Sequence, residues 1–123
     1  EPLRGLGMAE GLAVETRREG DIGVVTTDGY INNIGAEKVA EACNTMVDDG
    51  LTRILMNLEQ SRIINSIGIS ILIEVIEKVK GLEGKVGFCC VTPTVGKTFR
   101  IMGLLKASTV YETEAEALEG MKD

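Results

Sequence analysis

Apolar and polar side chains alternate near the start of the chain and recur at helical spacing further along. Residues 12–17 show the alternation of a half-buried strand, and residues 22–27 are rich in β-branched side chains. Gly20 and Asp21 lie between the two segments, and a Gly-Asp pair favours a tight turn. The pattern therefore predicts that the domain opens with a β-hairpin.

Beyond the hairpin, apolar side chains spaced three and four residues apart predict helices, and short apolar runs predict strands. The run at 53–58 does not alternate, which indicates a strand buried on both faces. The third predicted helix is expected to bury Val95, Phe99 and Met102. The predicted helices are 36–47, 66–80, 92–102 and 114–121, and the later strands are 53–58, 85–91 and 107–111.

The order of the predicted elements is β-β-α-β-α-β-α-β-α. A hairpin followed by alternating strands and helices predicts an α/β fold, with a small, mixed, mostly parallel β-sheet packed with about four α-helices. The 123 residues suffice for one domain, which we assign to residues 9–123. Residues 1–8 are expected to be an expression-tag remnant or a disordered N-terminus. They lack the apolar stretch of a signal peptide, and no run approaches the roughly 18 apolar residues that span a membrane.

The composition excludes several classes of function. The net charge is −6, and the chain has two Tyr, two Phe and no Trp, so neither phosphate attraction nor base stacking favours nucleic-acid binding. The chain also has no His, the commonest general base and the commonest ligand of transition metals. We therefore expect no catalytic residue, no metal site and no cofactor.

Two local motifs favour a structural interpretation over chemistry. Cys43, Cys89 and Cys90 form no C-x-x-C pair and are expected to be reduced thiols, with the adjacent pair pointing to opposite faces of a strand. The G-K-T tripeptide at 96–98 resembles the end of a phosphate-binding loop, but the first glycine of that motif would fall on Val91. The tripeptide also lies within a predicted helix, so an enzyme or nucleotide binder is the least favoured class.

Residues 63–68 are predicted to form a loop that delivers Ser66 to the exposed start of the helix at 66–80. A serine there can be an ordinary N-cap, whose side chain accepts a hydrogen bond from a backbone N–H of the first turn. It can also be a phosphate acceptor, because a phosphate would sit at the positive end of the helix dipole. Gly68 is expected to leave the helix entrance sterically open. The residues themselves leave both interpretations of the serine open.

The sequence around this serine resembles that of a known family. Asn65-Ser66-Ile67-Gly68, followed by a helix rich in Ile and Leu, is similar to the D-S-x-G-L segment of STAS domains, and specifically of bacterial anti-sigma factor antagonists. The resemblance extends over about residues 12–121. Further similarities lie, in the family's order, at Gly29, Met56-Asn57-Leu58, Gly103-Leu104 and residues 111–118.

The resemblance implies a cytoplasmic binding module and not an enzyme. Family members bind an anti-sigma factor that is also a serine kinase, and they thereby release the sigma factor that it holds. The kinase phosphorylates the serine of D-S-x-G and weakens the complex, and a PP2C-type phosphatase restores it. By position, the resemblance makes Ser66 the phosphorylated serine. The sequence departs from the family at Asn65, which replaces an Asp, and at Tyr30 and Asn32, which replace an acidic pair.

These observations lead to two hypotheses with the same fold. The first is an anti-sigma factor antagonist that is switched by phosphorylation of Ser66, without nucleic acid or membrane among its partners. The second is a STAS scaffold that is not phosphorylated and acts as an interaction module in a larger signalling or transport assembly. Under the first hypothesis, partner contacts are expected at Tyr30, Asn32, Asn33, Ile34, Ser61, Arg62, Asn65, Ser66, Ile67, Gly68 and Ser70.

Overall fold

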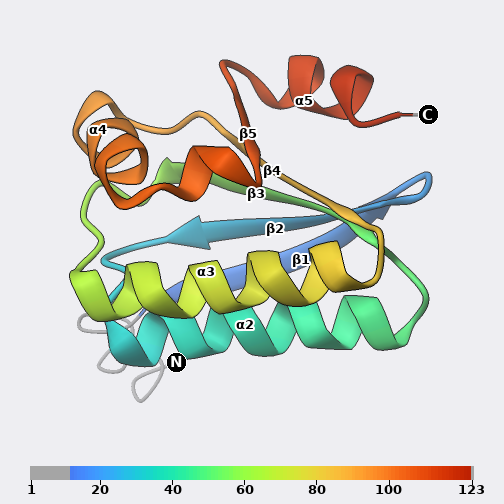
Figure 1. Ribbon diagram of the computed structural model, residues 1–123, viewed down its shortest axis with the longest axis horizontal. Helices are drawn as coiled ribbons and strands as arrows, with labels where there is room; N and C mark the ends of the chain where they lie inside the picture. The colour runs from blue at the N-terminus through green and yellow to red at the C-terminus, as the bar shows by residue number, and fades with distance from the viewer. Residues whose placement is uncertain (1–11, 123) are drawn as a thin grey trace, which may run out of the picture.

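The computed structural model describes residues 12–122, which form a five-stranded sheet and four α-helices (Figure 1). The strands lie in the order β1-β2-β3-β4-β5, with β1 antiparallel to β2 and the other neighbours parallel. They are β1 (Ala13–Glu19), β2 (Ile22–Asp28), β3 (Arg53–Gln60), β4 (Lys85–Cys89) and β5 (Thr109–Tyr111). The α-helices are α2 (Asn33–Asp48), α3 (Ser66–Gly81), α4 (Pro93–Met102) and α5 (Glu114–Gly120), and a 3₁₀ helix, η1 (Leu104–Lys106), follows α4.

Side chains at the helix starts explain why the helices begin where they do. Each of the four α-helices is preceded by a residue with extended backbone whose side-chain oxygen accepts a hydrogen bond from an N–H of the first turn. These N-caps are Asn32, Asn65, Thr92 and Thr113.

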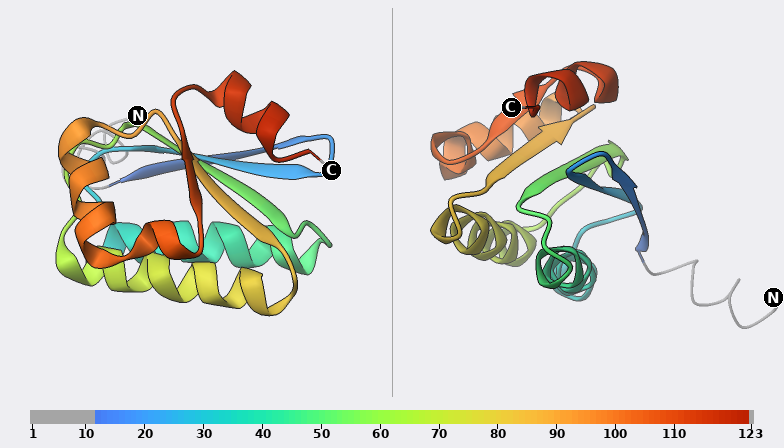
Figure 2. Two further views of the ribbon diagram at one scale, coloured as in Figure 1. Left: turned by 45° about the horizontal axis from the view of Figure 1, so that its top comes forward. Right: turned by 90° about the vertical axis from the view of Figure 1, so that its right-hand side faces the viewer.

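One face of the sheet is covered by α2 and α3, which lie side by side (Figures 1 and 2). Their buried side chains pack on Ile54, Met56 and Phe88 and form the larger of two hydrophobic clusters. α4 joins this cluster through Val95 and Phe99, and the rings of Phe88 and Phe99 meet edge to face with centroids 4.8 Å apart. The starts of α2 and α3 are therefore held on a well-packed layer.

The opposite face is covered by α5 alone among the described helices (Figure 2). Ala117 of α5 and Met121 just after it pack there on Val24, Leu55 and Cys89, in the smaller cluster. Gly87 of β4 allows this approach, because a Cβ at that position would lie 2.8 Å from the sulfur of Met121. The attachment of α5 thus rests on few apolar side chains.

Polar side chains at the N-terminus of α5 add to this attachment. Glu114 forms an ion pair with Arg17 of β1 and accepts a hydrogen bond from Nδ2 of Asn57 at 2.9 Å. The Arg17 guanidinium also donates to Glu19 at 2.8 Å. The hydrogen bond from Arg17 holds the pKa of Glu114 below its usual value, with Asn57 acting in the same sense and partial burial opposing both. We call Arg17, Asn57 and Glu114 the α5 polar network.

The fold class and the order of elements predicted from the sequence are confirmed, and two side chains lie elsewhere than expected. Met102, assigned to the core, is 44% exposed because α4 ends there, and Leu104 of η1 is buried instead. Cys90 lies beyond the end of β4 with a φ of +60°, so strand alternation does not apply to it. It packs with Cys89 against the smaller cluster, and the prediction of opposite faces is wrong.

Two further expectations concern residues 1–8 and membrane-spanning segments. The assignment of residues 1–8 to a tag remnant or disordered terminus lies outside the described residues. Within residues 12–122, no helix has the length and apolar character that crossing a bilayer requires.

Candidate functional site

Two loops meet at the end of the sheet where β2 and β3 finish. The first loop connects β2 to α2, and the second connects β3 to α3. The N–H of Ile31 donates to the C=O of Ile63 at 2.9 Å, and the N–H of Asn65 donates to the C=O of Ile31 at 3.1 Å. Gly29 in the first loop donates in turn to the C=O of Gln60 at 3.1 Å. The two loops therefore form one hydrogen-bonded unit.

Asparagine side chains start both helices that follow these loops. Oδ1 of Asn32 accepts from the N–H of Gly35 at 2.8 Å, and Oδ1 of Asn65 accepts from the N–H of Gly68 at 2.7 Å. The first turns of α2 and α3 contain no acidic residue. Two positive helix ends thus lie near each other without a carboxylate in either first turn, which favours added negative charge there.

Ser66 is the first residue of α3, and its side chain is exposed. Asn65, not Ser66, is the N-cap, because Asn65 has the extended backbone (φ −91°, ψ 173°) that a cap requires. The interpretation of Ser66 as the capping residue is therefore wrong. The C=O of Ser66 accepts a hydrogen bond from the hydroxyl of Ser70 at 3.1 Å. The Ser66 hydroxyl is left at the surface, where chemistry can reach it.

Gly68 does not leave an open entrance, contrary to the sequence-based expectation. It is buried, and a Cβ at this position would lie 2.8 Å from the C=O oxygen of Ile31 and 3.2 Å from Oδ1 of Asn65. Glycine is needed here because α3 packs directly on the backbone of the first loop. The residue positions the helix start and offers no space to a ligand.

A buried pair of hydroxyl groups lies beneath the second loop. Oγ1 of Thr27 and Oγ of Ser61 are 2.6 Å apart, and the two residues are 0% and 1% exposed. Ser61, expected to contact a partner, is therefore inaccessible in this conformation. Sequence reasoning missed Thr27, although a polar residue at a core-facing position of an apolar strand is a signal for such a pair.

Four large, exposed apolar side chains lie on the same pair of loops and helix starts as Ser66. Tyr30 is 47% exposed, Ile34 63%, Ile63 61% and Ile67 56%. Ile63 was not among the predicted contact residues, although an isoleucine in a polar loop was a signal for one. Exposed apolar side chains that gather in one place mark interaction sites more often than single ones do. We call Tyr30, Ile34, Ile63, Ser66 and Ile67 the Ser66 surface.

The eleven residues predicted to contact a partner divide by exposure, and contact itself stays a prediction. Asn32 and Asn65 are half-buried caps, and Ser61 and Gly68 are buried. The exposed members are Tyr30, Asn33, Ile34, Arg62, Ser66, Ile67 and Ser70.

Two of the three cysteines, Cys43 and Cys89, are buried, which disfavours a reactive thiolate. Burial raises the pKa of the Cys43 thiol to about 12. The pKa of Cys89 is raised as well, first by burial and then by the neighbouring Cys90. Within residues 12–122, no group of three or more His, Cys, Asp or Glu side chains is arranged to hold a metal ion. The Ser66 surface is therefore the candidate site.

Comparison with known proteins places the fold and the sequence in one family. The STAS domain family model matches residues 13–117. The chain is 26% identical over 113 residues to the anti-sigma-F factor antagonist RsfB of Mycobacterium tuberculosis, and the match covers 92% of each protein.

Two solved structures agree with this assignment. An anti-sigma factor antagonist from Mycobacterium paratuberculosis superposes with a TM-score of 0.82 at 24% identity, over 92% of this chain and 96% of that one. The phosphorylated form of the Bacillus cell fate determinant SpoIIAA gives a TM-score of 0.71 at 20% identity, over 89% of this chain and 100% of that one. At these identities the two structures establish the fold. With the family match, they show that the chain belongs to the STAS domain family and is similar to bacterial anti-sigma factor antagonists.

Proposed function

We propose that this protein is an anti-sigma factor antagonist, which binds an anti-sigma factor that is also a serine kinase and is switched by phosphorylation of Ser66. The observation that carries the proposal is the exposed Ser66 hydroxyl at the first position of α3, on a pair of joined loops and helix starts that also expose large apolar side chains. The similarity to RsfB, which is named an anti-sigma-F factor antagonist, supports the binding role. The similarity to SpoIIAA, which was solved in a phosphorylated form, supports the switch by phosphorylation. The protein acts by binding, as a regulator in the cytoplasm, and a PP2C-type phosphatase reverses the modification.

The physical basis of the switch is a change of charge on a surface suited to apolar contact. Phosphorylation adds about −1.5 to −2 charge at neutral pH. The positive end of α3 and the N–H groups of its first turn can accommodate that charge in the free protein. A partner that covers Tyr30, Ile34, Ile63 and Ile67 would have to bury the same charge, which is costly without a cationic group opposite. Phosphorylation therefore weakens binding and leaves the fold intact.

Asn65 is compatible with this role although it carries no charge. Its contact with α3 is a hydrogen bond from the N–H of Gly68 to Oδ1, and an amide oxygen accepts that bond as an aspartate oxygen would. The absence of a carboxylate beside Ser66 removes a repulsion from the phosphate. The cap and the phosphate acceptor are thus two adjacent residues with separate tasks.

Substitutions at Ser66, with Ser70 as the matched control, test the proposal. Ser66→Asp should weaken binding to the anti-sigma factor about tenfold or more, measured by calorimetry. Ser66→Ala should bind normally but gain no phosphate from the kinase and ATP, whereas the unmodified chain should gain about 80 Da in intact mass. Ser70→Ala changes another exposed serine of the same helix and should leave phosphate incorporation intact, which would locate the modified residue at Ser66.

Two outcomes would contradict parts of the proposal. If Ser66→Asp binds as tightly as the unmodified chain, the switch is rejected. If the chain binds the partner but gains no phosphate at any residue, the unphosphorylated STAS scaffold is the better description.

A further inference from the structure

Among the described residues, β1 leaves one edge of the sheet unpaired, and the Ser66 surface does not use this edge. β1 is the first strand in the sheet order, and within residues 12–122 it pairs with β2 and with no other strand. Five of its seven residues are exposed. A long, exposed edge strand offers unpaired N–H and C=O groups to another strand. This edge is therefore a candidate interaction surface.

The hairpin turn determines which residues of β1 offer those groups. Glu19 pairs with Ile22 across a two-residue turn whose first residue, Gly20, has a φ of +63°. In such a turn the C=O before the turn accepts a hydrogen bond from the N–H after it, so the groups of Glu19 face β2. Hydrogen-bonded and non-hydrogen-bonded pairs alternate along an antiparallel ladder. The residues whose groups face the free edge are therefore Val14, Thr16 and Arg18.

We propose that two copies of this chain pair antiparallel through β1, about a two-fold axis at Thr16. In this register Thr16 lies opposite the partner's Thr16, and Val14 lies opposite the partner's Arg18, so every outward group meets another outward group. Glu15 then lies opposite the partner's Arg17, in a non-hydrogen-bonded pair where cross-strand side chains come closest. The two-fold axis repeats each contact, and the two five-stranded sheets become one continuous sheet.

Charge selects this register over its neighbours. A slip of two residues in one direction places Glu15 opposite the partner's Glu15, and a slip in the other places Arg17 opposite the partner's Arg17. A slip of one residue places the outward N–H and C=O groups of one copy opposite residues of the other copy whose N–H and C=O groups are already hydrogen-bonded to β2. β1 is thus complementary to itself in one register, which favours a second copy of the chain over an unrelated strand.

The present contacts of Arg17 leave room for the new one. Its Nε donates to Glu19 and its Nη2 pairs with Glu114, and a guanidinium carries five N–H groups in all. Because the side chain is 42% exposed, solvent and salt screen its interactions. The dimer is therefore expected to be weak and to dissociate as ionic strength rises.

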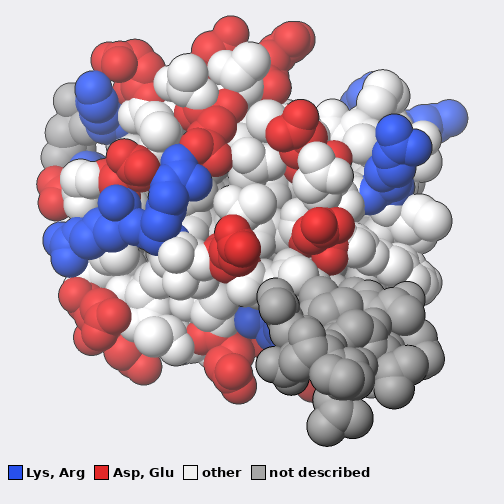
Figure 3. Space-filling view, turned by 180° about the vertical axis from the view of Figure 1, so that it is seen from behind, with Lys and Arg blue, Asp and Glu red and all other residues white. Residues whose placement is uncertain are grey.

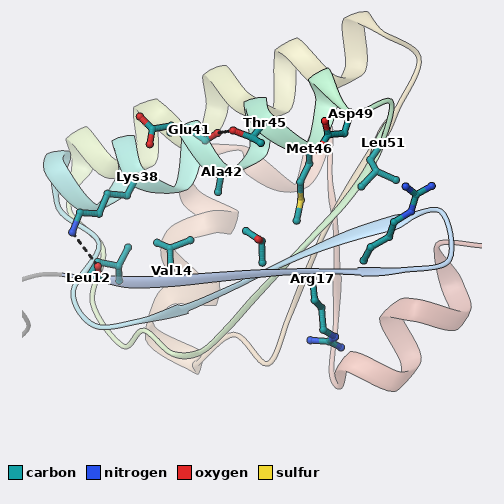
Figure 4. Close-up of a pocket in the computed structure, with 12 residues that line it drawn as sticks. Leu12, Val14, Arg17, Lys38, Glu41, Ala42, Thr45, Met46, Asp49 and Leu51 are labelled. Carbon is teal, nitrogen blue, oxygen red and sulfur yellow. Dashed lines mark hydrogen bonds between the residues drawn. The ribbon is translucent and has the colours of Figure 1, made fainter.

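A groove beside the edge supports the same axis. It has a volume of about 700 Å³ and lies between β1 and α2, with Val14, Ala42 and Met46 on its walls (Figure 4). Lys38 lies at one end of it and Asp49 at the other. A two-fold axis through Thr16 brings the Lys38 end of the groove in one copy towards the Asp49 end of the groove in the other copy, so opposite charges face each other. Seen from the β1 side of the molecule, basic side chains gather towards the hairpin turn with acidic ones next to them (Figure 3).

Mass measured over a range of concentrations tests for the dimer. We expect the mass of the full chain to rise from 13.2 kDa towards twice that value between about 1 μM and about 1 mM protein at low salt. Thr16→Pro removes the N–H on the axis and should abolish the rise, because an edge strand tolerates proline where the N–H faces solvent. Thr16→Ala keeps that N–H and should dimerise normally. A constant monomer mass, or a dimer that survives Thr16→Pro with an unchanged melting temperature, would overturn the proposal.

Crosslinking tests the register. Hydrogen-bonded antiparallel pairs have Cα atoms about 5.5 Å apart, which is within disulfide range, so Thr16→Cys should crosslink to its own copy on mild oxidation. Arg18→Cys should not, because the two copies of that residue lie about 14 Å apart in this register. The unmodified chain, oxidised in parallel, accounts for its native cysteines. Crosslinking of Arg18→Cys in preference to Thr16→Cys would refute the axis. Ser66 is not on β1, so Ser66→Asp should leave the dimer unchanged whatever it does to partner binding.

Discussion

The two faces of the sheet are covered very unequally. α2 and α3 have 16 residues each and bury a continuous apolar layer, whereas α5 has seven residues and belongs to a cluster of six buried side chains. The face covered by α5 has polar contacts in addition, namely the α5 polar network. Since apolar burial is the main stabilising term in folding, the α2–α3 face should hold most of the stability.

This difference suits the proposed switch. Ser66 begins the helix that is best anchored in the protein, so a new charge there alters the surface without loosening the layer beneath it. α5 depends on groups that remain partly exposed to solvent, and it should open before the rest of the domain. The predictions that follow test this contrast.

The largest effect should come from the α2–α3 face. Leu72 of α3 is fully buried, and Leu72→Ala should lower the free energy of unfolding by about 2–5 kcal/mol because it removes apolar contact and leaves a cavity. Denaturant titration measures the change. Ile67→Ala, on the exposed side of the same helix, should change stability by less than about 0.5 kcal/mol. If both substitutions cost the same, burial does not govern this face.

A smaller effect should follow from removing the carboxylate of the α5 polar network. Glu114→Ala should cost about 1–2 kcal/mol, because Asn57 and Arg17 lose a charged hydrogen-bond partner that is partly shielded from water. Hydrogen exchange should localise the loss to α5 and leave α3 protected. Glu116→Ala, an exposed glutamate of the same first turn, is the control and should have little effect. Loss of protection in α3 would show that the two faces unfold together.

Much of the fold could be predicted from the sequence. The apolar spacing at 66–80 predicted a helix, and this helix contributes to the larger cluster, while the lack of alternation at 53–58 predicted the strand that is buried on both faces. Both rest on periodicity, which a sequence states directly. The hairpin and the parallel order of the remaining strands followed from the same pattern.

The details that failed depend on contacts between distant segments. Spacing alone could not show that Gly68 packs on the Ile31 backbone, or that Thr27 meets Ser61 across 34 residues. The sequence left the capping role of Ser66 open, because serine and asparagine are both good N-caps and only backbone geometry decides between them. The α5 polar network was missed because its members lie on three separate elements.

An intermediate test concerns the cap beside Ser66. Asn65→Ala removes the acceptor for the Gly68 N–H and should lower stability by about 1 kcal/mol, measured by denaturant titration. Asn65→Asp keeps an acceptor and should restore most of this loss, since a carboxylate at a helix N-terminus is also favourable. Equal losses in the two variants would mean that the side-chain NH₂ group of Asn65, and not its side-chain oxygen, stabilises the site.

The smallest effect should be a pH dependence of the α5 attachment. The folded-state pKa of Glu114 lies below its ordinary value of 4.5, chiefly because Arg17 donates to it. A group whose pKa is lowered on folding adds stability above its unfolded pKa, and that contribution disappears as the pH falls through the folded pKa. The stability difference between the unmodified chain and Glu114→Gln should therefore be constant near neutral pH and narrow below about pH 4.5.

The expected change is only about 0.5 kcal/mol, because solvent screens the exposed Arg17 side chain. Matched denaturant titrations of the two proteins in steps of pH measure it, and the subtraction removes the contribution of the other carboxylates. If the stability difference between the two proteins stays constant through the acid range, Glu114 stabilises the attachment of α5 through packing and neutral hydrogen bonds. The attachment of α5 to its face of the sheet would then depend on packing and not on charge, as the attachment of α2 and α3 to the other face does.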